Sequence, residues 1–190
     1  MRAVSNSDYR LVTRALTGDR RAGEALVTRH HGDLFNLFMW LTRDPELAEN
    51  LTQETFVRVW ERLSQFRGES SFRTWSHSIA YSILSSHHRE EARESHALRE
   101  YALRANAHPD ARRRAETRAA LAEALAQLSK QEQQVVVLCK LQGFTLAEAA
   151  EMVSRPVGTL AWQMAQALRK LRGLLAEDIS AGDVQPAENR

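Results

Sequence analysis

The sequence is poor in the residues that mark several protein classes: it has one cysteine, four prolines and eight glycines among 190 residues. The lone Cys139 rules out an internal disulfide framework, and its helical spacing from Val135 favours a small core residue over a reactive thiol. Apolar runs such as residues 135–139 are far too short to span a bilayer, and the N-terminus lacks the apolar stretch of a signal peptide. We therefore expect a cytoplasmic protein without membrane insertion.

An excess of one charge is also missing. The chain has 26 Lys and Arg against 24 Asp and Glu, which gives a formal net charge of +2. A strongly basic chain would indicate nucleic-acid binding by itself, and this chain is not one. Any such function must therefore rest on the geometry of its motifs.

Motifs for catalysis are absent as well: the sequence has no Gly-rich phosphate loop, no zinc-type Cys/His spacing and no HExxH. Two pairs of adjacent histidines occur at 30–31 and 87–88, but neighbouring side chains on a helix point in different directions. We expect no enzymatic activity, no metal or other cofactor, and no small-molecule substrate.

What is present is helical periodicity, and the chain is predicted to be all-α. Helices are expected to begin near positions 7, 19, 45 and 70, the second either running on or breaking at Gly32, with Asp44-Pro45 as an N-cap and first helical residue. The residues expected to face inward on the third and fourth helices are Phe56, Val59, Trp60, Leu63, Phe72, Trp75, Ile79 and Ile83. We predict two small helical domains, residues 1–88 and 115–176, joined by a charged linker at 89–114 and followed by a disordered tail at 177–190.

The stretch 129–175 predicts a helix-turn-helix. Ser129 with Glu132 and Thr145 with Glu148 both fit the capping box, and Gly143 between them is suited to the left-handed conformation that ends a helix. Pro156 is well placed to start the last helix. Its apolar stripe is expected to be Val157, Leu160, Met164, Leu168 and Leu171, and its outward residues Thr159, Trp162, Gln163 and Gln166. A short helix, a tight turn and a half-exposed helix form a geometry that enters the major groove of DNA.

Bacterial extracytoplasmic-function (ECF) sigma factors resemble this chain in two regions. Their conserved region two is similar to residues 47–56 (LAENLTQETF), Trp60, residues 66–75 (FRGESSFRTW) and residues 79–80. Their region four is similar to Leu128, the helix from Glu132, and residues 143–145, 148–150 and 156–159. The resemblance implies a sigma region 2-like four-helix domain, a sigma region 4-like helix-turn-helix domain and a promoter-specificity subunit of RNA polymerase.

On the helix after Pro45, one polar and acidic face with an apolar residue at its centre suits a protein interface. It consists of Asn50, Gln53, Glu54, Val57 and Glu61. The resemblance implies that this face docks on the clamp helices of the largest subunit of core RNA polymerase. Asn50 stands where the family usually has Asp, which removes one charge that could pair with a basic partner.

The loop 66–71 and the helix start beyond it resemble the part of the family that captures a flipped base of the −10 element. Extracting a base costs a few kcal/mol, which stacking and edge hydrogen bonds in a pocket offset. The candidate residues are Phe66, Arg67, Arg73 and Ser82; Ser82 aligns with a position that is often Asn in the family. Phe72 and Trp75 have the spacing of core residues instead.

For the −35 element, the resemblance points to the helix that starts after Pro156. The candidate contacts are Arg155, Thr159, Trp162, Gln163, Gln166, Arg169 and Lys170, with Arg172 as a further possible phosphate contact. The family usually offers Lys or Arg where this chain has Ala161, Gln163, Gln166 and Leu168. Glutamines at 163 and 166 are suited to bidentate hydrogen bonds with adenine edges, worth ~1–3 kcal/mol each; surface residues of no special role are the alternative.

Three functions remain open at the level of sequence. The first is an ECF-type sigma factor that binds core polymerase and promoter DNA, starts transcription of a stress or signal-responsive regulon, and is held inactive by an anti-sigma factor. The second is a sigma-like interaction protein that keeps its protein-binding faces but has lost promoter recognition, as the neutral recognition helix and Asn50 suggest. The third, a helix-turn-helix repressor, is weaker because the N-terminal half shows no ligand-pocket signature.

Overall fold

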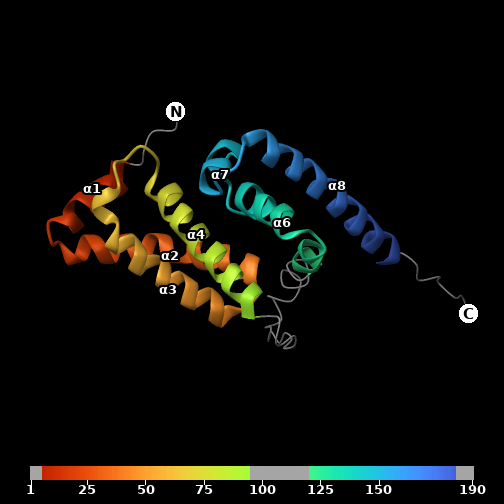
Figure 1. The fold of residues 1–190 in the computed structure, drawn as a ribbon, viewed down its shortest axis with the longest axis horizontal. Helices are drawn as coiled ribbons and strands as arrows, with labels where there is room; N and C mark the ends of the chain where they lie inside the picture. Colours follow the sequence, from red (N-terminus) through yellow and green to blue (C-terminus); the bar gives the residue numbers. More distant parts are fainter. Residues whose placement is uncertain (1–5, 95–119, 183–190) are drawn as a thin grey trace, which may run out of the picture. The chain divides into compact units, whose positions relative to one another are not determined.

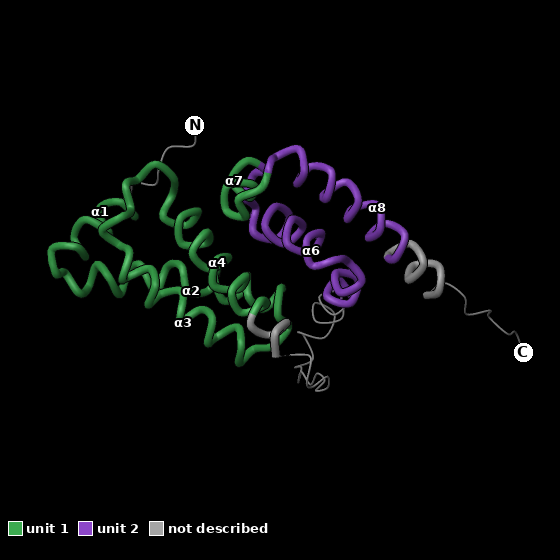
Figure 2. The backbone as a smooth tube through the Cα atoms, viewed as in Figure 1, with its two compact units in different colours: residues 1–103, 147–155 green, residues 104–146, 156–190 purple. Residues whose placement is uncertain are grey.

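The computed structural model describes residues 6–94 and 120–182, and within these ranges the chain is helical with no strand (Figure 1). The chain divides into two compact units: unit 1 contains residues 1–103 and 147–155, and unit 2 contains residues 104–146 and 156–190 (Figure 2). Most of the expected linker, 89–114, lies outside the described residues, as does the end of the expected tail. Among the described residues, none of the helices combines the length and apolar character needed to cross a bilayer.

Unit 1 is built mainly from an N-terminal set of helices. They are α1 (Asn6–Leu16), α2 (Arg20–Thr42), α3 (Pro45–Glu61), a single 3₁₀ turn η1 (Leu63–Gln65) and α4 (Phe72–Glu94). The helix α2 runs through Gly32 without a break, and α4 extends past the expected boundary at residue 88. The most extensive packing within this set is between α1 and α2, α2 and α3, and α3 and α4, and α2 also contacts α4.

Aspartates start two of these helices, as the sequence predicts. The Asp44 side chain accepts hydrogen bonds from the backbone N–H groups of Glu46 and Leu47 at 2.9 and 3.1 Å, with Pro45 at the first helical position. The side chain of Asp19 accepts from the N–H of Ala22 at 3.2 Å. Each cap satisfies donors that the helix itself leaves open, which fixes where α2 and α3 begin.

The buried apolar residues of unit 1 follow the predicted stripes except at Trp75, which is half-buried, and at Trp60. Phe56, Val59 and Leu63 are buried, but Trp60 is 37% exposed. The expectation that Trp60 faces inward is therefore wrong: at 100° per residue Trp60 lies about 40° beyond Phe56, which marks the edge of the buried arc of α3. The ring of Trp60 lies over Gly23 and forms one wall of an open depression of about 490 Å³ between the start of α2 and the end of α3.

Unit 2 contains a helical segment at residues 120–126, α6 (Lys130–Val136), a π turn η2 (Val137–Leu141) and α8 (Val157–Gly182). The predicted capping box at the start of α6 is confirmed: Ser129 and Glu132 satisfy each other's backbone N–H groups. Gly143 adopts the predicted left-handed conformation, with φ 75°. The last helix continues beyond residue 176, so residues 177–182 are helical rather than part of a disordered tail.

The short helix α7 (Leu146–Met152) and the turn after it belong to unit 1 except for Leu146, whereas α8 belongs to unit 2. Ala149 and Ala150 are buried on α7. Ser154 takes a left-handed conformation with φ 51°, and the N–H of Arg155 donates to the carbonyl of Ala150 at 3.0 Å. The left-handed residue and this hydrogen bond form the tight turn that the sequence predicts before Pro156.

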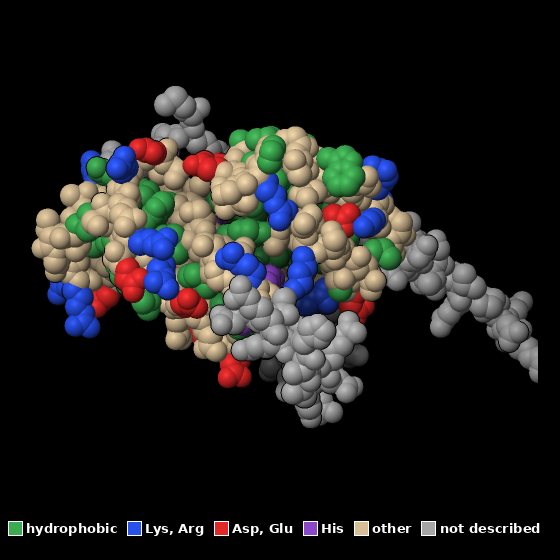
Figure 3. Space-filling model, viewed as in Figure 1, with side chains coloured by type: hydrophobic (Ala, Val, Ile, Leu, Met, Phe, Trp, Pro, Cys, Tyr) green, Lys and Arg blue, Asp and Glu red, His purple; other side chains and the backbone are tan. Residues whose placement is uncertain are grey.

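Positive and negative side chains are interspersed on the face drawn in Figure 3, notably over the N-terminal helices. This distribution agrees with the near-balance of charge in the sequence. Function must therefore be assigned from local groups of residues rather than from one large field of a single sign.

Candidate functional site

The outward face of α3 is the first candidate surface. The residues expected there, Asn50, Gln53, Glu54, Val57 and Glu61, are all exposed. Val57 is 56% exposed, while Leu51, Thr55 and Val59 on the opposite face are buried. The Val57 side chain is mostly exposed and surrounded by polar residues, so it contributes little to the core of unit 1.

Neighbouring side chains restrain the polar groups on this face. The Gln53 amide donates to Glu49 at 3.0 Å, and this bond together with one from His31 lowers the pKa of the Glu49 carboxyl. Arg58 forms an ion pair with Glu61 at 3.0 Å. Glu61 therefore presents a partly neutralised carboxylate, and the acidic centre of the face falls on Glu54.

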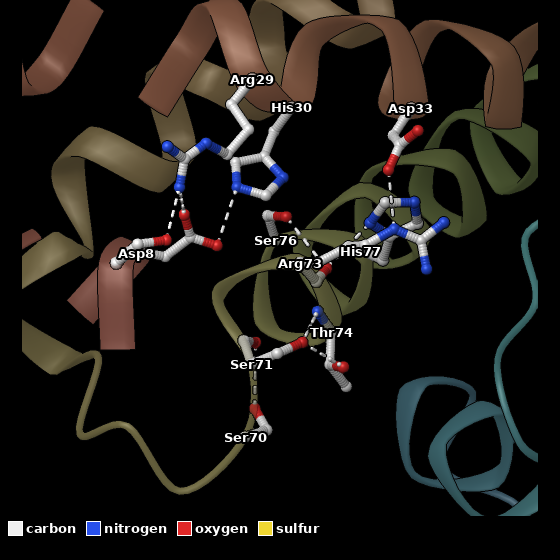
Figure 4. A network of polar contacts seen from close by, with 11 residues as sticks. Asp8, Arg29, His30, Asp33, Ser70, Ser71, Arg73, Thr74, Ser76 and His77 are labelled. Carbon is white, nitrogen blue, oxygen red and sulfur yellow. Dashed lines mark hydrogen bonds and ion pairs between the residues drawn. The ribbon is translucent and has the colours of Figure 1, made fainter. Parts of the chain in front are cut away.

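The second candidate surface is the loop 66–71 and the first turn of α4 (Figure 4). Ser71 caps α4: its Oγ accepts from the N–H of Thr74 at 3.0 Å and lies 2.8 Å from the Thr74 hydroxyl. Gly68 has φ 74°, and a Cβ added there would lie 3.0 Å from the ring of Tyr9. Both features hold the loop in one conformation.

Phe66 does not lie at the surface of this loop, although sequence reasoning places it among the base-contacting candidates. It is 7% exposed, and its ring centre lies 5.3 Å from that of Trp75 and 5.7 Å from that of Phe72. Stacking a base on Phe66 would require this aromatic cluster to open. The expected core role is confirmed for Phe72, which is 1% exposed; Trp75 is half-buried.

The remaining −10 candidates do not form one group. Arg67 is exposed on the loop, and Arg73 donates from Nε to Asp33 on α2 at 2.7 Å. Ser82 is also exposed, but nine residues separate it from Arg73 on α4. At about 100° and 1.5 Å per residue, Ser82 lies on the opposite side of the helix and about 13 Å further along it. The structure therefore brings Arg73 and Asp33 together, and leaves Ser82 apart.

Behind the loop lies a buried polar network that sequence reasoning did not identify (Figure 4). Asp8 on α1 is 6% exposed; it forms an ion pair with Arg29 and lies 3.3 Å from Nε2 of His30, both on α2. The ring of His30 packs on Phe72 with centres 5.0 Å apart. The only sequence signal for this network is a histidine inside the apolar stripe of α2, between Leu26 and Leu34.

His77 extends the network along α4. Its Nδ1 lies 2.8 Å from the carbonyl oxygen of Arg73, and a carbonyl only accepts, so Nδ1 carries the proton. Burial lowers the pKa of His77 to about 4. Burial also lowers the pKa of His30, because its effect outweighs the opposing effect of Asp8. Both histidines are therefore neutral in the folded protein at neutral pH.

The third candidate surface is α8. Of its predicted stripe, Leu160, Met164 and Leu171 are buried, Leu168 is half-buried and Val157 is 47% exposed; Ala167, which was not predicted, is buried as well. Val157 occupies the first turn, beyond the reach of α6. Thr159, Trp162 and Arg169 are exposed as expected, with Trp162 at 63%, while Gln166 and Arg155 are half-buried.

Two candidates on α8 are engaged inside unit 2. Gln163 is 6% exposed, and its amide donates to Gln131 on α6 at 3.1 Å, so the expectation that Gln163 faces outward is wrong. The reason is angular: at 100° per residue Gln163 lies about 40° beyond Ala167, at the edge of the buried face that packs against α6. Lys170 donates to Glu132 at 2.9 Å; although burial opposes ionisation, this bond and those from Ser129 lower the pKa of the Glu132 carboxyl.

Comparisons with known proteins agree on one family. Residues 26–94 match the family model described as Sigma-70 region 2, and residues 118–171 match the one described as Sigma-70, region 4. The second match runs without a break across α6, α7 and α8.

Curated relatives match over most of the chain. The RNA polymerase sigma-H factor of Pseudomonas aeruginosa is 27% identical over 83% of this chain and 88% of its own length. The ECF RNA polymerase sigma factor SigC of Mycobacterium tuberculosis is 29% identical over 88% of this chain and 92% of its own length. Among solved structures, CnrH in complex with the cytosolic domain of CnrY is similar with a TM-score of 0.70 and 25% identity, covering 91% of this chain and 99% of CnrH.

Proposed function

Because the chain belongs to the ECF group of RNA polymerase sigma factors, which are transcription initiation factors and not enzymes, we propose a division of labour among its three surfaces. The outward face of α3 binds core polymerase, the loop 66–71 with Arg73 holds the −10 element, and α8 binds the −35 element. On this proposal the protein acts in the cytoplasm with the polymerase and starts transcription of a signal-responsive regulon.

The observation that carries the proposal is the exposed Val57 at the centre of a polar face on α3. Glu54 lies next to it and is exposed. An apolar centre with a charged rim is the composition of a protein interface, and a basic partner helix would satisfy both parts. The clamp helices of the largest polymerase subunit are the partner that the family assignment supplies.

Substitution on α3 tests this assignment by capture of core polymerase on the immobilised full-length protein. Glu54→Lys and Val57→Glu should each weaken capture at least tenfold, since changing a hot-spot residue at the centre of an interface costs about 2 kcal/mol or more. Glu123→Lys, the same charge change at an exposed residue of unit 2, is the matched control and should leave capture unchanged. Equal capture by all four proteins would remove α3 from the interface.

For the −10 element, the ion pair between Arg73 and Asp33 supports a specific arrangement. Asp33 holds the guanidinium at the first turn of α4, beside the loop whose conformation Ser71 and Gly68 fix. We assign base or phosphate contact to Arg67 and Arg73, and a supporting role in the loop to the buried Phe66. Ser82 would contact DNA further along the strand than these two arginines.

A second candidate function is favoured by the state of α8. Gln163 is buried and Lys170 is bound to Glu132, so two of the expected polar contacts to DNA are already engaged within unit 2. A sigma-like interaction protein that binds polymerase without reading promoters would fit this state. Run-off transcription from a promoter library distinguishes the two: transcripts support the sigma factor, and polymerase binding without transcripts supports the interaction protein.

A protein inhibitor is also part of the proposal. CnrH, which this chain resembles over nearly its whole length, was solved with the cytosolic domain of a second protein. We infer that an anti-sigma factor of comparable size binds this chain and releases it when a signal arrives. Co-purification of the full-length chain from its own cells, followed by mass spectrometry of the bound proteins, tests this inference.

A further inference from the structure

Most of the outward arc of α8 consists of apolar and small side chains, with Thr159 at one edge and cations toward its C-terminal end. Helical geometry places these residues on one arc of about 140°: Val157, Gly158, Ala161, Trp162, Ala165, Arg169 and Arg172. Val157 and Trp162 are the two large members, at 47% and 63% exposure. Nothing in the packing of unit 2 needs them there, because the opposite arc supplies the contacts with α6.

Few hydrogen-bonding groups remain at this arc: the Thr159 hydroxyl at its edge and the indole N–H of Trp162. Gln163 is turned inward and bonded to Gln131, while Gln166 is half-buried at the edge of the arc. A helix that enters the major groove with this surface presents methyl, methylene and indole groups to the base edges. The only apolar group that a base pair shows in that groove is the C5-methyl of thymine.

Resting on the proposed −35 function, we infer that α8 reads thymine methyl groups, with Trp162 and Val157 as the specificity-determining residues. The small residues Gly158, Ala161 and Ala165 let the helix approach the base edges closely. Arg169 and Arg172 lie about two and three turns beyond Trp162, where they can meet phosphates. Between Val157 and Ala176 the helix has no Asp or Glu, so its charge complements a polyanion.

Deoxyuridine provides a direct probe, because it keeps every hydrogen bond of thymine and lacks only the methyl group. Holoenzyme formed from core polymerase and the full-length protein first selects its −35 element from a randomised promoter library. Each thymine of that element is then replaced by deoxyuridine, and binding is measured by filter retention. At one or more positions we expect about fourfold weaker binding per methyl lost, the factor associated with burying one such group.

Two test variants and one control variant complete the experiment. In Trp162→Ala, and to a smaller extent in Val157→Ala, the penalty for deoxyuridine should shrink toward none. Leu16→Ala removes an equally exposed apolar side chain from α1 and should retain the full penalty. Deoxyuridine placed between the −35 and −10 elements should not change binding by any of the proteins.

The inference is overturned by three results. They are a selected −35 element without thymine on either strand, binding indifferent to deoxyuridine, or a penalty that Trp162→Ala leaves unchanged. If Trp162→Ala instead abolishes binding of a protein partner while the deoxyuridine penalty persists, the arc is a protein-docking surface and not a methyl reader. The proposed sigma function survives all of these, and it fails separately if no polymerase-dependent promoter binding is found.

Discussion

His77 lies in the interior of unit 1, where its protonation state is linked to stability. Its pKa is about 4 in the folded chain, against an ordinary value near 6.5. Between these values the unfolded chain takes up a proton that the folded chain does not, so stability is complete above pH ~6.5 and falls as the pH drops toward 4. At pH 5 the loss amounts to about 2 kcal/mol.

We therefore expect His77→Gln, whose amide is able to donate to the same carbonyl, to show a flatter pH dependence than the wild type. Urea unfolding at pH 7.5 and pH 5 measures it, and the difference between the two pH values should shrink by about 2 kcal/mol. Some dependence remains because burial also lowers the pKa of His30. His31→Gln, at a half-buried histidine of α2, serves as control. An unchanged pH dependence in His77→Gln would place the acid sensitivity elsewhere.

Which residues could be predicted at this scale depends on whether the partner is local in sequence. Asp44 and Ser129 bond to groups two or three residues away, and both were predicted from their spacing. Gln163 is held by Gln131 and Lys170 by Glu132, across 32 and 38 residues. A helical wheel gives the angle of Gln163 on α8, but not how much of the α8 surface α6 covers. Gln163 lies at the edge of the covered surface, and it was therefore predicted to be exposed although it is buried.

The loop 66–71 depends on glycine at one position. Gly68 has φ 74°, where a side chain strains the backbone, and a Cβ there would lie 3.0 Å from the ring of Tyr9. We expect Gly68→Ala to destabilise unit 1 by about 1–3 kcal/mol, measured as a lower urea midpoint. It should also reduce promoter opening, followed by permanganate reactivity of the −10 thymines, more than polymerase capture.

Gly32 provides the matched comparison for this prediction. It lies in the middle of α2 with open space around its missing Cβ, so Gly32→Ala should stabilise the helix by about 0.5–1 kcal/mol. Opposite signs for the two substitutions would show that backbone conformation, and not the added methyl group, decides the outcome. A stabilised Gly68→Ala would contradict the assigned role of the loop.

At the scale of elements, capping signals predicted where the helices start, but they did not predict where a helix continues or changes its geometry. No pattern marked the π turn at residues 137–141, where the N–H of Gln142 bonds to the carbonyl of Val137. The continuous apolar run at residues 135–139 has no periodicity that would distinguish α from π geometry. Trp60 was misplaced for a related reason: the sequence shows that it is apolar, but not that Gly23 leaves room for its ring near the surface.

For the molecule as a whole, near-neutral charge limits how strongly it can depend on phosphate contacts. The net charge is +2, and positive side chains alternate with negative ones on much of the face in Figure 3. Fold class and family were predictable because the periodicity and the two sets of motifs extend over most of the chain. The balance between phosphate and base contacts was not predictable, because it depends on which cations are already paired.

Salt dependence of promoter binding measures that balance. Arg169 is exposed on α8, and no ion pair within the described residues involves it; Lys170 is bound to Glu132 at 2.9 Å. We expect Arg169→Ala to reduce the slope of log K against log salt by about 0.9, the value for one phosphate contact. Lys170→Ala should change the slope by less than half as much, because its ammonium already has a carboxylate partner.

The two variants should also separate in stability. Lys170→Ala leaves Glu132, whose side chain is 9% exposed, with only its bonds to Ser129, so thermal unfolding should occur at a lower temperature than in Arg169→Ala. Holoenzyme titrations on one promoter from 50 to 200 mM salt, paired with thermal scans of each free protein, give both quantities. Equal salt slopes together with equal unfolding temperatures for the two variants would contradict this prediction. They would mean that Lys170 leaves Glu132 and binds phosphates when DNA is present, so that Lys170 is a DNA contact.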